Sequence, residues 1–207
     1  MDDHLGDEAA LASERQRYLT DGYALMEAVV PPDLVGFLTN YVHTLSEAGR
    51  LMADGRVDGS ASLYGDPAFD TILAAMAPLV RALTRRRVDP TYSFVRLYMR
   101  NSNLHKHIDR PACEHSVSVH LASSDPATHW PLHMSLSDGK HTEIALRPGD
   151  GVLYKGVERP HWRDDCPVDW CVQLFLHFVD VDGPHKDERF DRRPTLGVPR
   201  GETETHA

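Results

Sequence analysis

The sequence predicts a mainly β fold with N-terminal helices. Its apolar residues follow a helical period up to about Arg86 and change to an alternating, strand-like period from Tyr92 onward. Short candidate strands then follow one another, separated by turns rich in Gly, Pro, Asn, Asp and Ser. Short strands at this spacing are typical of a barrel or a jelly roll. A chain of 207 residues is long enough to bury one such core.

The first part of the chain is predicted to be mainly helical. Residues 7–20 form an amphipathic pattern, and residues 33–48 and 69–86 carry apolar side chains on one face at helical spacing. Residues 23–30 are β-prone and predict a strand between the first two helices. The stretch 49–66 is rich in Gly, Asp and Ser and is predicted to be an irregular loop.

The β region follows, and a polar tail ends the chain. The candidate strands lie at residues 92–100, 116–122, 132–136, 142–146, 151–154 and 170–179. We therefore expect three parts, which are a helical cap at 1–90 packed on the core, a catalytic β core at 91–182 and a tail at 183–207. The tail is charged and rich in Pro, so we expect it to be partly disordered, above all at 201–207.

Charge and composition limit the partners. A formal net charge of −9 argues against nucleic acid, because phosphate binding needs a basic surface. We expect a small molecule or a peptide instead, with a slight preference for a neutral or cationic one. The start of the chain lacks the features of a signal peptide, and the longest apolar stretch, residues 172–179, is too short to span a bilayer. We therefore expect a cytoplasmic protein with no membrane segment.

A candidate metal site lies at the start of the β region. In a strand, residues i and i+2 project to the same face, so His107 and Asp109 present an imidazole and a carboxylate side by side. His161, from a distant strand, can complete a three-point site. Two His and one carboxylate leave three positions open on a metal, which is the arrangement of non-heme Fe(II) oxygenases. A second HxD pattern at 185–187 lies in the polar tail, where no sheet supplies a third ligand.

A longer series of residues strengthens this interpretation. The series comprises Tyr98, Asn101-Ser102-Asn103-Leu104, the HxD motif, Trp130-Pro131, Pro148-Gly149-Asp150 and His161. Its order and spacing resemble the catalytic core of the Fe(II)/2-oxoglutarate-dependent dioxygenases, and within them the prolyl-4-hydroxylase-like group, over about residues 92–179. The resemblance implies a double-stranded β-helix (jelly-roll) core with Fe(II) held by His107, Asp109 and His161.

The resemblance also implies an activity. Such an enzyme hydroxylates an unactivated C–H bond of a small molecule, amino acid or peptidyl residue, or desaturates or cyclises it. It uses Fe(II), O2 and 2-oxoglutarate as co-substrate, and it releases succinate and CO2.

The co-substrate pocket is where the chain departs from the resemblance. By likeness, Tyr98 is a polar wall residue near 2-oxoglutarate, and His120 is an inward residue that hydrogen-bonds its distal carboxylate. Relatives usually carry an Arg or Lys about nine or ten residues after the last His, whereas this chain has Trp170 and Cys171 there. A buried carboxylate needs a charged partner. We expect Arg163 to serve, and two further candidates are Arg96 and Arg100.

Two alternatives stay open at this point. The first is a cupin-like metalloenzyme that does not use 2-oxoglutarate and binds its metal through His105, His107, Glu114 and His161, although Glu114 trails the second His by more than cupins allow. The second is a non-catalytic jelly-roll binding module. The missing basic residue at Trp170 or Cys171 is its main support.

Overall fold

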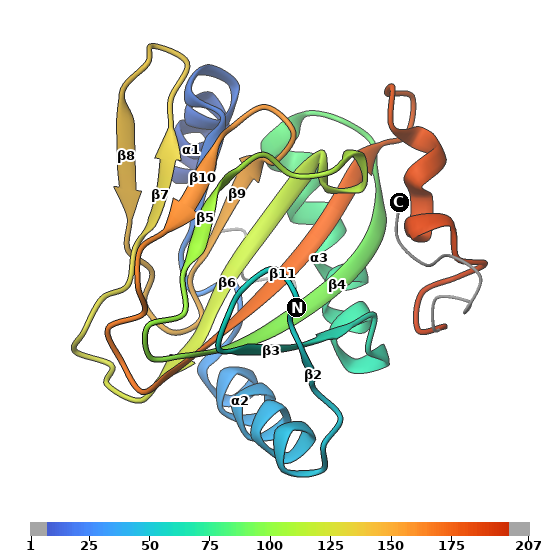
Figure 1. Ribbon diagram of the computed structural model, residues 1–207. Coiled ribbons are helices and arrows are strands. Elements are labelled where there is room, and N and C mark those ends of the chain that lie inside the picture. The colour runs from blue at the N-terminus through green and yellow to red at the C-terminus, as the bar shows by residue number, and fades with distance from the viewer. Residues whose placement is uncertain (1–7, 199–207) are drawn as a thin grey trace.

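Two antiparallel sheets face each other in the computed structural model, which describes residues 8–198 (Figure 1). The large sheet has the order β1-β9-β6-β11-β4-β3-β2, and the small sheet has the order β5-β10-β7-β8. The large-sheet strands are β1 (Tyr23–Met26), β2 (Met52–Ala53), β3 (Ser60–Tyr64), β4 (Val88–Met99), β6 (His115–Ser123), β9 (Gly151–Lys155) and β11 (Trp170–Asp180). The small-sheet strands are β5 (Leu104–His107), β7 (Leu132–Ser135), β8 (His141–Ile144) and β10 (His161–Arg163). The predicted jelly-roll core is confirmed.

Three helices cover the outer face of the large sheet (Figure 1). They are α1 (Glu8–Asp21), α2 (Pro32–Glu47) and α3 (Pro67–Thr84). Alternation along β11 sends Val172, Leu174 and Leu176 to this side, where they join the main hydrophobic core with the apolar helix faces. The other face of β11, with Cys171 and Phe175, looks toward the small sheet and forms a second apolar cluster.

The sequence prediction differs from the structure mainly at strand boundaries. The stretch 49–66 is not an irregular loop throughout, because it contains β2 and β3, and β3 pairs with β4 from Ser60↔Tyr98 to Tyr64↔Phe94. Small residues fill most of β3, so the strand carries no apolar alternation that sequence reasoning could detect. The strand predicted at 23–30 ends at Met26, and Ala28 adopts a left-handed conformation (φ 46°).

The beginning of the tail is packed rather than free. After β11 the chain forms the short turns of η2 (Lys186–Arg192), and Arg193 then pairs with Asp70 of α3 at 3.0 Å, with both side chains 2% exposed. Residues 201–207, for which disorder was predicted, lie outside the described residues. The boundaries of the three expected parts at 1–90, 91–182 and 183–207 stay a prediction, although β1 and β3 from the first part lie within the core sheet.

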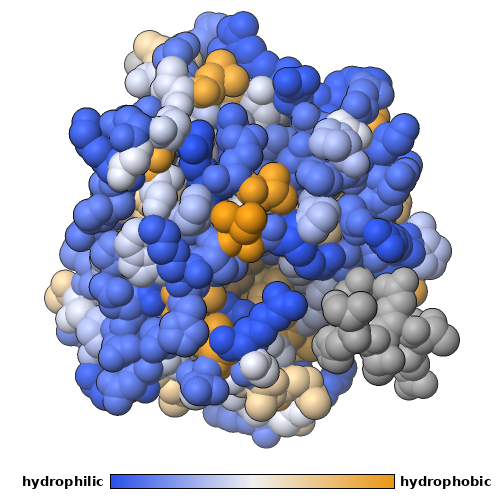
Figure 2. All heavy atoms as spheres, turned by 45° about the horizontal axis from the view of Figure 1, so that its top comes forward, coloured by the Kyte–Doolittle hydropathy of each residue, from blue (hydrophilic) through white to orange (hydrophobic). Residues whose placement is uncertain are grey.

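The surface is mainly hydrophilic on the face drawn in Figure 2, where apolar groups are few and small. The large apolar residues exposed within the described chain are Leu19, Phe37, Met52, Met99 and Ile108. No helix among residues 8–198 is both long and apolar enough to cross a membrane.

The buried pair of Arg193 and Asp70 should matter for stability. Arg193→Met leaves the Asp70 carboxylate buried without its cation, so we expect the free energy of unfolding in urea to fall by about 3–5 kcal/mol. Arg87→Met is the matched control, because its pair with Asp182 is 74% and 76% exposed. We expect that variant to stay within about 1 kcal/mol of wild type. A loss of similar size in both variants would show that the tail is not anchored by this pair.

Candidate metal centre

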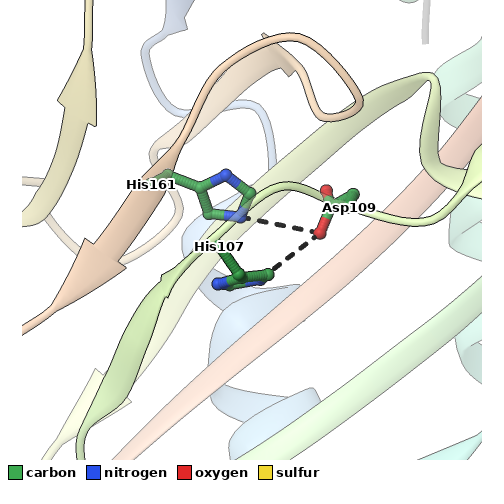
Figure 3. A group of neighbouring side chains, drawn as sticks. All are labelled: His107, Asp109 and His161. Atoms are coloured by element: carbon green, nitrogen blue, oxygen red, sulfur yellow. Dashed lines mark ion pairs between the residues drawn. The ribbon is translucent and has the colours of Figure 1, made fainter.

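Strand pairing brings the two candidate histidines together. β5 and β10 are antiparallel neighbours, and His107 at the end of β5 lies directly opposite His161 at the start of β10. Their ring centroids are 4.4 Å apart. Asp109 follows two residues after His107, in the loop beyond β5. Figure 3 shows the three side chains converging on one point from these two segments.

The ligand atoms of the three residues face one another. Asp109 Oδ1 lies 3.5 Å from His107 Nε2 and 3.6 Å from His161 Nε2. His107 Nδ1 lies 2.7 Å from the carbonyl oxygen of His105, and His161 Nδ1 lies 2.8 Å from that of Arg159. A carbonyl oxygen only accepts hydrogen bonds, so each Nδ1 carries the proton. Each Nε2 then offers its lone pair toward the centre, and the donor set fits a 2-His-1-carboxylate metal ion.

Hydrogen bonds on the side away from the two histidines hold the Asp109 carboxylate in place. Ser116 Oγ donates to Asp109 Oδ2 at 2.9 Å and lies 2.9 Å from Nδ1 of the buried His177. The Asp109 backbone N–H donates to the carbonyl of Gly156 at 2.9 Å. A Cβ atom on Gly156 would collide with Asp109 Oδ2, so only glycine permits this approach. These contacts leave Oδ1 directed at the two histidines.

Electrostatics keep this carboxylate ionised. Burial of Asp109 opposes ionisation, but its hydrogen bond with His107 and its attraction to the His161 and His177 imidazoles, which are protonated only at acidic pH, outweigh burial and lower its pKa to about 2. The hydrogen bond with Asp109 raises the pKa of His107, although burial and the charge of Arg96 oppose it. Burial lowers the pKa of His161 and leaves it a neutral ligand.

A polar group lies deeper between the sheets, around Arg163. This side chain is on the same face of β10 as His161 and is only 2% exposed. Its guanidinium donates to the Trp130 carbonyl and, at 3.4 Å, to Gln173 Oε1. Gln173 Nε2 lies 2.9 Å from Nδ1 of His120. Burial and the Arg163 charge lower the pKa of His120 to about 4, so this imidazole is neutral at pH 7.

Two buried polar atoms on this inner surface have no hydrogen-bond partner among residues 8–198. They are Arg163 Nε and Ser118 Oγ, and each is a group whose burial without a hydrogen bond is costly. Tyr98 is fully buried, and its hydroxyl accepts from Arg96 Nη1 at 2.9 Å, which leaves the hydroxyl proton free to be donated. A carboxylate placed beside Arg163 would accept a hydrogen bond from its unpartnered Nε, so this side chain has the chemistry to bind an anionic group.

The structure also explains the missing basic residue. Trp170 turns to the helix side of the large sheet, where its ring meets that of His43. Cys171 turns inward, and with His120, Arg163 and Gln173 it lines a pocket between the sheets. The inward position is therefore a thiol in this chain, and the buried cation that lines the same pocket is Arg163 of the neighbouring sheet. Arg100 is on the surface, paired with Asp169.

The four residues of the cupin-like alternative do not form one cluster. Glu114 groups with His115 and Asp180 rather than with His107 and His161, and among residues 8–198 no cluster of three or more ligand atoms includes His105. The His105 backbone contributes instead by accepting the His107 hydrogen bond.

Several further residues support the centre. Arg110, next to Asp109, forms a two-point pair with Asp191 of η2 at 2.7 and 2.8 Å, so the tail anchors the loop that carries Asp109. The sequence prediction missed the supporting roles of Asp191, Ser116 and His177. The only signal for His177 was a polar residue inside the apolar run 172–179.

Comparison with known proteins gives structural likeness only. No protein-family model matches the sequence, and no curated protein sequence matches it. A prolyl-4-hydroxylase from Pseudomonas putida has a TM-score of 0.68 and 22% identity, with 82% of this chain and 98% of that chain covered. A prolyl hydroxylase from Trichoplax adhaerens, in complex with a peptide fragment of the hypoxia inducible factor oxygen degradation domain, has a TM-score of 0.70 and 15% identity, covering 88% and 92%.

A third similar protein has a solved structure that contains bound ligands. The epimerase SnoN from nogalamycin biosynthesis, in complex with Fe3+, alpha ketoglutarate and nogalamycin RO, has a TM-score of 0.69 and 14% identity, covering 84% of this chain and 85% of that chain. These likenesses agree with the jelly roll described above. The chain has the fold of the Fe(II)/2-oxoglutarate-dependent oxygenases, with prolyl-4-hydroxylases among its structural neighbours.

Proposed function

We propose that the protein is an Fe(II)- and 2-oxoglutarate-dependent oxygenase that hydroxylates an unactivated C–H bond of a small molecule, amino acid or peptidyl residue. The observation that carries this proposal is the convergence of His107 Nε2, Asp109 Oδ1 and His161 Nε2 within an oxygenase fold. Both kinds of substrate have support among the neighbours, one of which binds a peptide and another nogalamycin RO.

Each residue has a distinct task. His107, Asp109 and His161 would hold Fe(II) on one face and leave the opposite face for the other reactants. When bound, Fe(II), 2-oxoglutarate and O2 supply the oxidation of a C–H bond, with succinate and CO2 as products. Ser116 orients Asp109 by its hydrogen bond.

The inner pocket would bind the co-substrate. Arg163 offers a charged, partly unsatisfied guanidinium to the distal carboxylate, and the Tyr98 hydroxyl can donate beside it. His120 stays neutral and keeps Gln173 in place next to Arg163. The apolar cluster that includes Phe175 and Cys171 would help to exclude water when the co-substrate is bound.

An anaerobic titration tests the proposed function. Fe(II) added with 2-oxoglutarate should produce a weak visible charge-transfer band in the wild type, because the co-substrate chelates the metal. Asp109→Ala should lose or sharply weaken the band, while Asp138→Ala, a surface variant, should keep it. Tight Fe(II) binding without a band in the wild type would contradict the use of 2-oxoglutarate. A band without substrate-linked succinate release would favour the non-catalytic binding module.

Arg163 should determine co-substrate affinity. Arg163→Gln removes the charge-assisted hydrogen bonds to the distal carboxylate, so we expect the Kd of 2-oxoglutarate to rise about 10- to 100-fold with Fe(II) affinity unchanged. The charge-transfer band reports both quantities. Arg100→Gln, at the exposed pair with Asp169, is the control and should bind 2-oxoglutarate as the wild type does. Equal affinities in all three proteins would remove Arg163 from the co-substrate site.

Metal affinity should depend on pH through His107. Its pKa is raised above the ordinary value, so its protonated form persists to higher pH, and a proton must leave before a metal binds. Below that pKa we expect the Fe(II) Kd to rise roughly tenfold for each unit by which the pH is lowered. Anaerobic equilibrium titrations between pH 5.5 and 8.5 measure this slope, and His105→Gln should leave it unchanged. An Fe(II) Kd that does not vary over this range would contradict ligation by His107.

A further inference from the structure

A second buried arginine, Arg96, lies on the inner face of the jelly roll. Along β4 the neighbours Val95 and Leu97 face the helices, whereas Arg96 points between the sheets. Its guanidinium carbon lies 5.1 Å from the ring centroid of Phe94, 5.2 Å from that of Tyr98 and 5.8 Å from that of Phe175. Cation–π contacts of this kind hold the charge in place, and the same charge acts on His107 of the metal centre.

The acid that pairs with Arg96 comes from outside the jelly-roll strands. Asp54 lies in the loop between β2 and β3, and its Oδ2 is 2.6 Å from Arg96 Nη2 and 2.8 Å from Arg96 Nε. The side chains are 10% and 7% exposed. Asp54 Oδ1 accepts a hydrogen bond from the backbone N–H of Arg56 in the same loop. The carboxylate therefore belongs to this loop, while Arg96 is on β4, a strand of the large sheet.

The loop reaches into the space between the sheets. Val57, at its tip, is 1% exposed and packs with Tyr98, Cys171 and Phe175. The loop is joined to the large sheet by β2, an edge strand of two residues. Arg96 uses one N–H of each nitrogen for Asp54 and Tyr98, so each Nη keeps a second N–H.

Removing one partner of a buried ion pair is costly, because the other charge is left buried and unpaired. If Asp54 leaves with its loop, another anion must take its place at Arg96. Arg163 is the separate cation that the proposed function assigns to the co-substrate, since it is bonded to Gln173 and Trp130. The inner surface therefore presents two buried guanidiniums, that of Arg163, which the proposed function assigns to the co-substrate, and that of Arg96, whose anion in this structure is Asp54.

We propose that Arg96 binds a carboxylate of the substrate, and that Asp54 occupies this site until the substrate arrives. The proposal rests on the proposed function for the position of the substrate beside the metal. It makes the substrate class an anionic one, a small molecule or residue that carries a carboxylate. The overall charge of −9 favours the approach of neutral or cationic ligands from a distance. Once a ligand is bound, its strongest electrostatic interaction is with the nearest charge, and a buried arginine attracts an anion.

The anion site can be tested without metal or co-substrate. Asp54→Ala empties the site, and acetate is the probe, with acetamide as the neutral control at the same ionic strength. We expect acetate to raise the Tm of Asp54→Ala saturably by a few degrees, with little effect on the wild type and none on Asp54→Ala/Arg96→Met. Asp54→Asn, which keeps the side-chain shape, is measured in the same way in case the alanine variant does not fold.

A second arm distinguishes the substrate from the co-substrate. Anaerobic Asp54→Ala loaded with Fe(II) and 2-oxoglutarate should bind acetate while the Kd of 2-oxoglutarate changes less than about twofold. Competition between acetate and 2-oxoglutarate would assign Arg96 to the co-substrate and overturn the proposal. Absence of any acetate response in the first arm would make the pair purely structural and also overturn it. If acetate stabilises Asp54→Ala but the wild type shows no charge-transfer band, the anion site at Arg96 is supported and the oxygenase assignment is refuted.

Discussion

The antiparallel pairing of β5 with β10 is the constraint on which the site depends. It places His107 and His161 opposite each other, although they are far apart in the sequence, and fixes their rings at a centroid distance of 4.4 Å. Register matters because a shift of one residue would turn His161 away and bring Trp162 to the centre. Arg163 follows His161 at a spacing of two and faces the same side of β10, although the pairing with β5 shifts between these two residues. One short strand thus positions both a candidate metal ligand and the proposed cation for the co-substrate.

A second constraint holds the carboxylate. Asp109 is beyond the end of β5, where the sheet no longer determines its direction, and other segments supply what the sheet does not. Gly156 approaches its backbone, Ser116 binds its outer oxygen, and the Arg110–Asp191 pair fastens the following residue to the tail. The tail is in turn fastened to α3 by Arg193. The geometry at Asp109 therefore depends on residues from distant parts of the chain.

The sequence predicted those features that leave a local pattern. Alternation revealed the jelly-roll strands, and the i, i+2 spacing put His107 with Asp109 and His161 with Arg163. The supporting contacts leave no such pattern. Asp191 and Arg193 belong to a segment that reads as polar tail, and their burial follows only from folding against α3 and β4. The sequence prediction missed β3 because small residues stand where an apolar face would be expected. It missed the burial of Asp54 because the surrounding loop has the composition of an exposed turn.

The central claim is that one carboxylate and two imidazoles, and no other His of this region, form the metal site. Equilibrium Fe(II) affinity of Asp109→Ala compared with His105→Ala tests it most directly, because the two residues flank His107 at equal distance in the sequence. We predict that Asp109→Ala loses Fe(II) affinity by at least about 100-fold, while His105→Ala stays within about threefold of wild type, since only its backbone contacts the site. Loss of affinity in His105→Ala with retention in Asp109→Ala would contradict this account and favour a cupin-like centre.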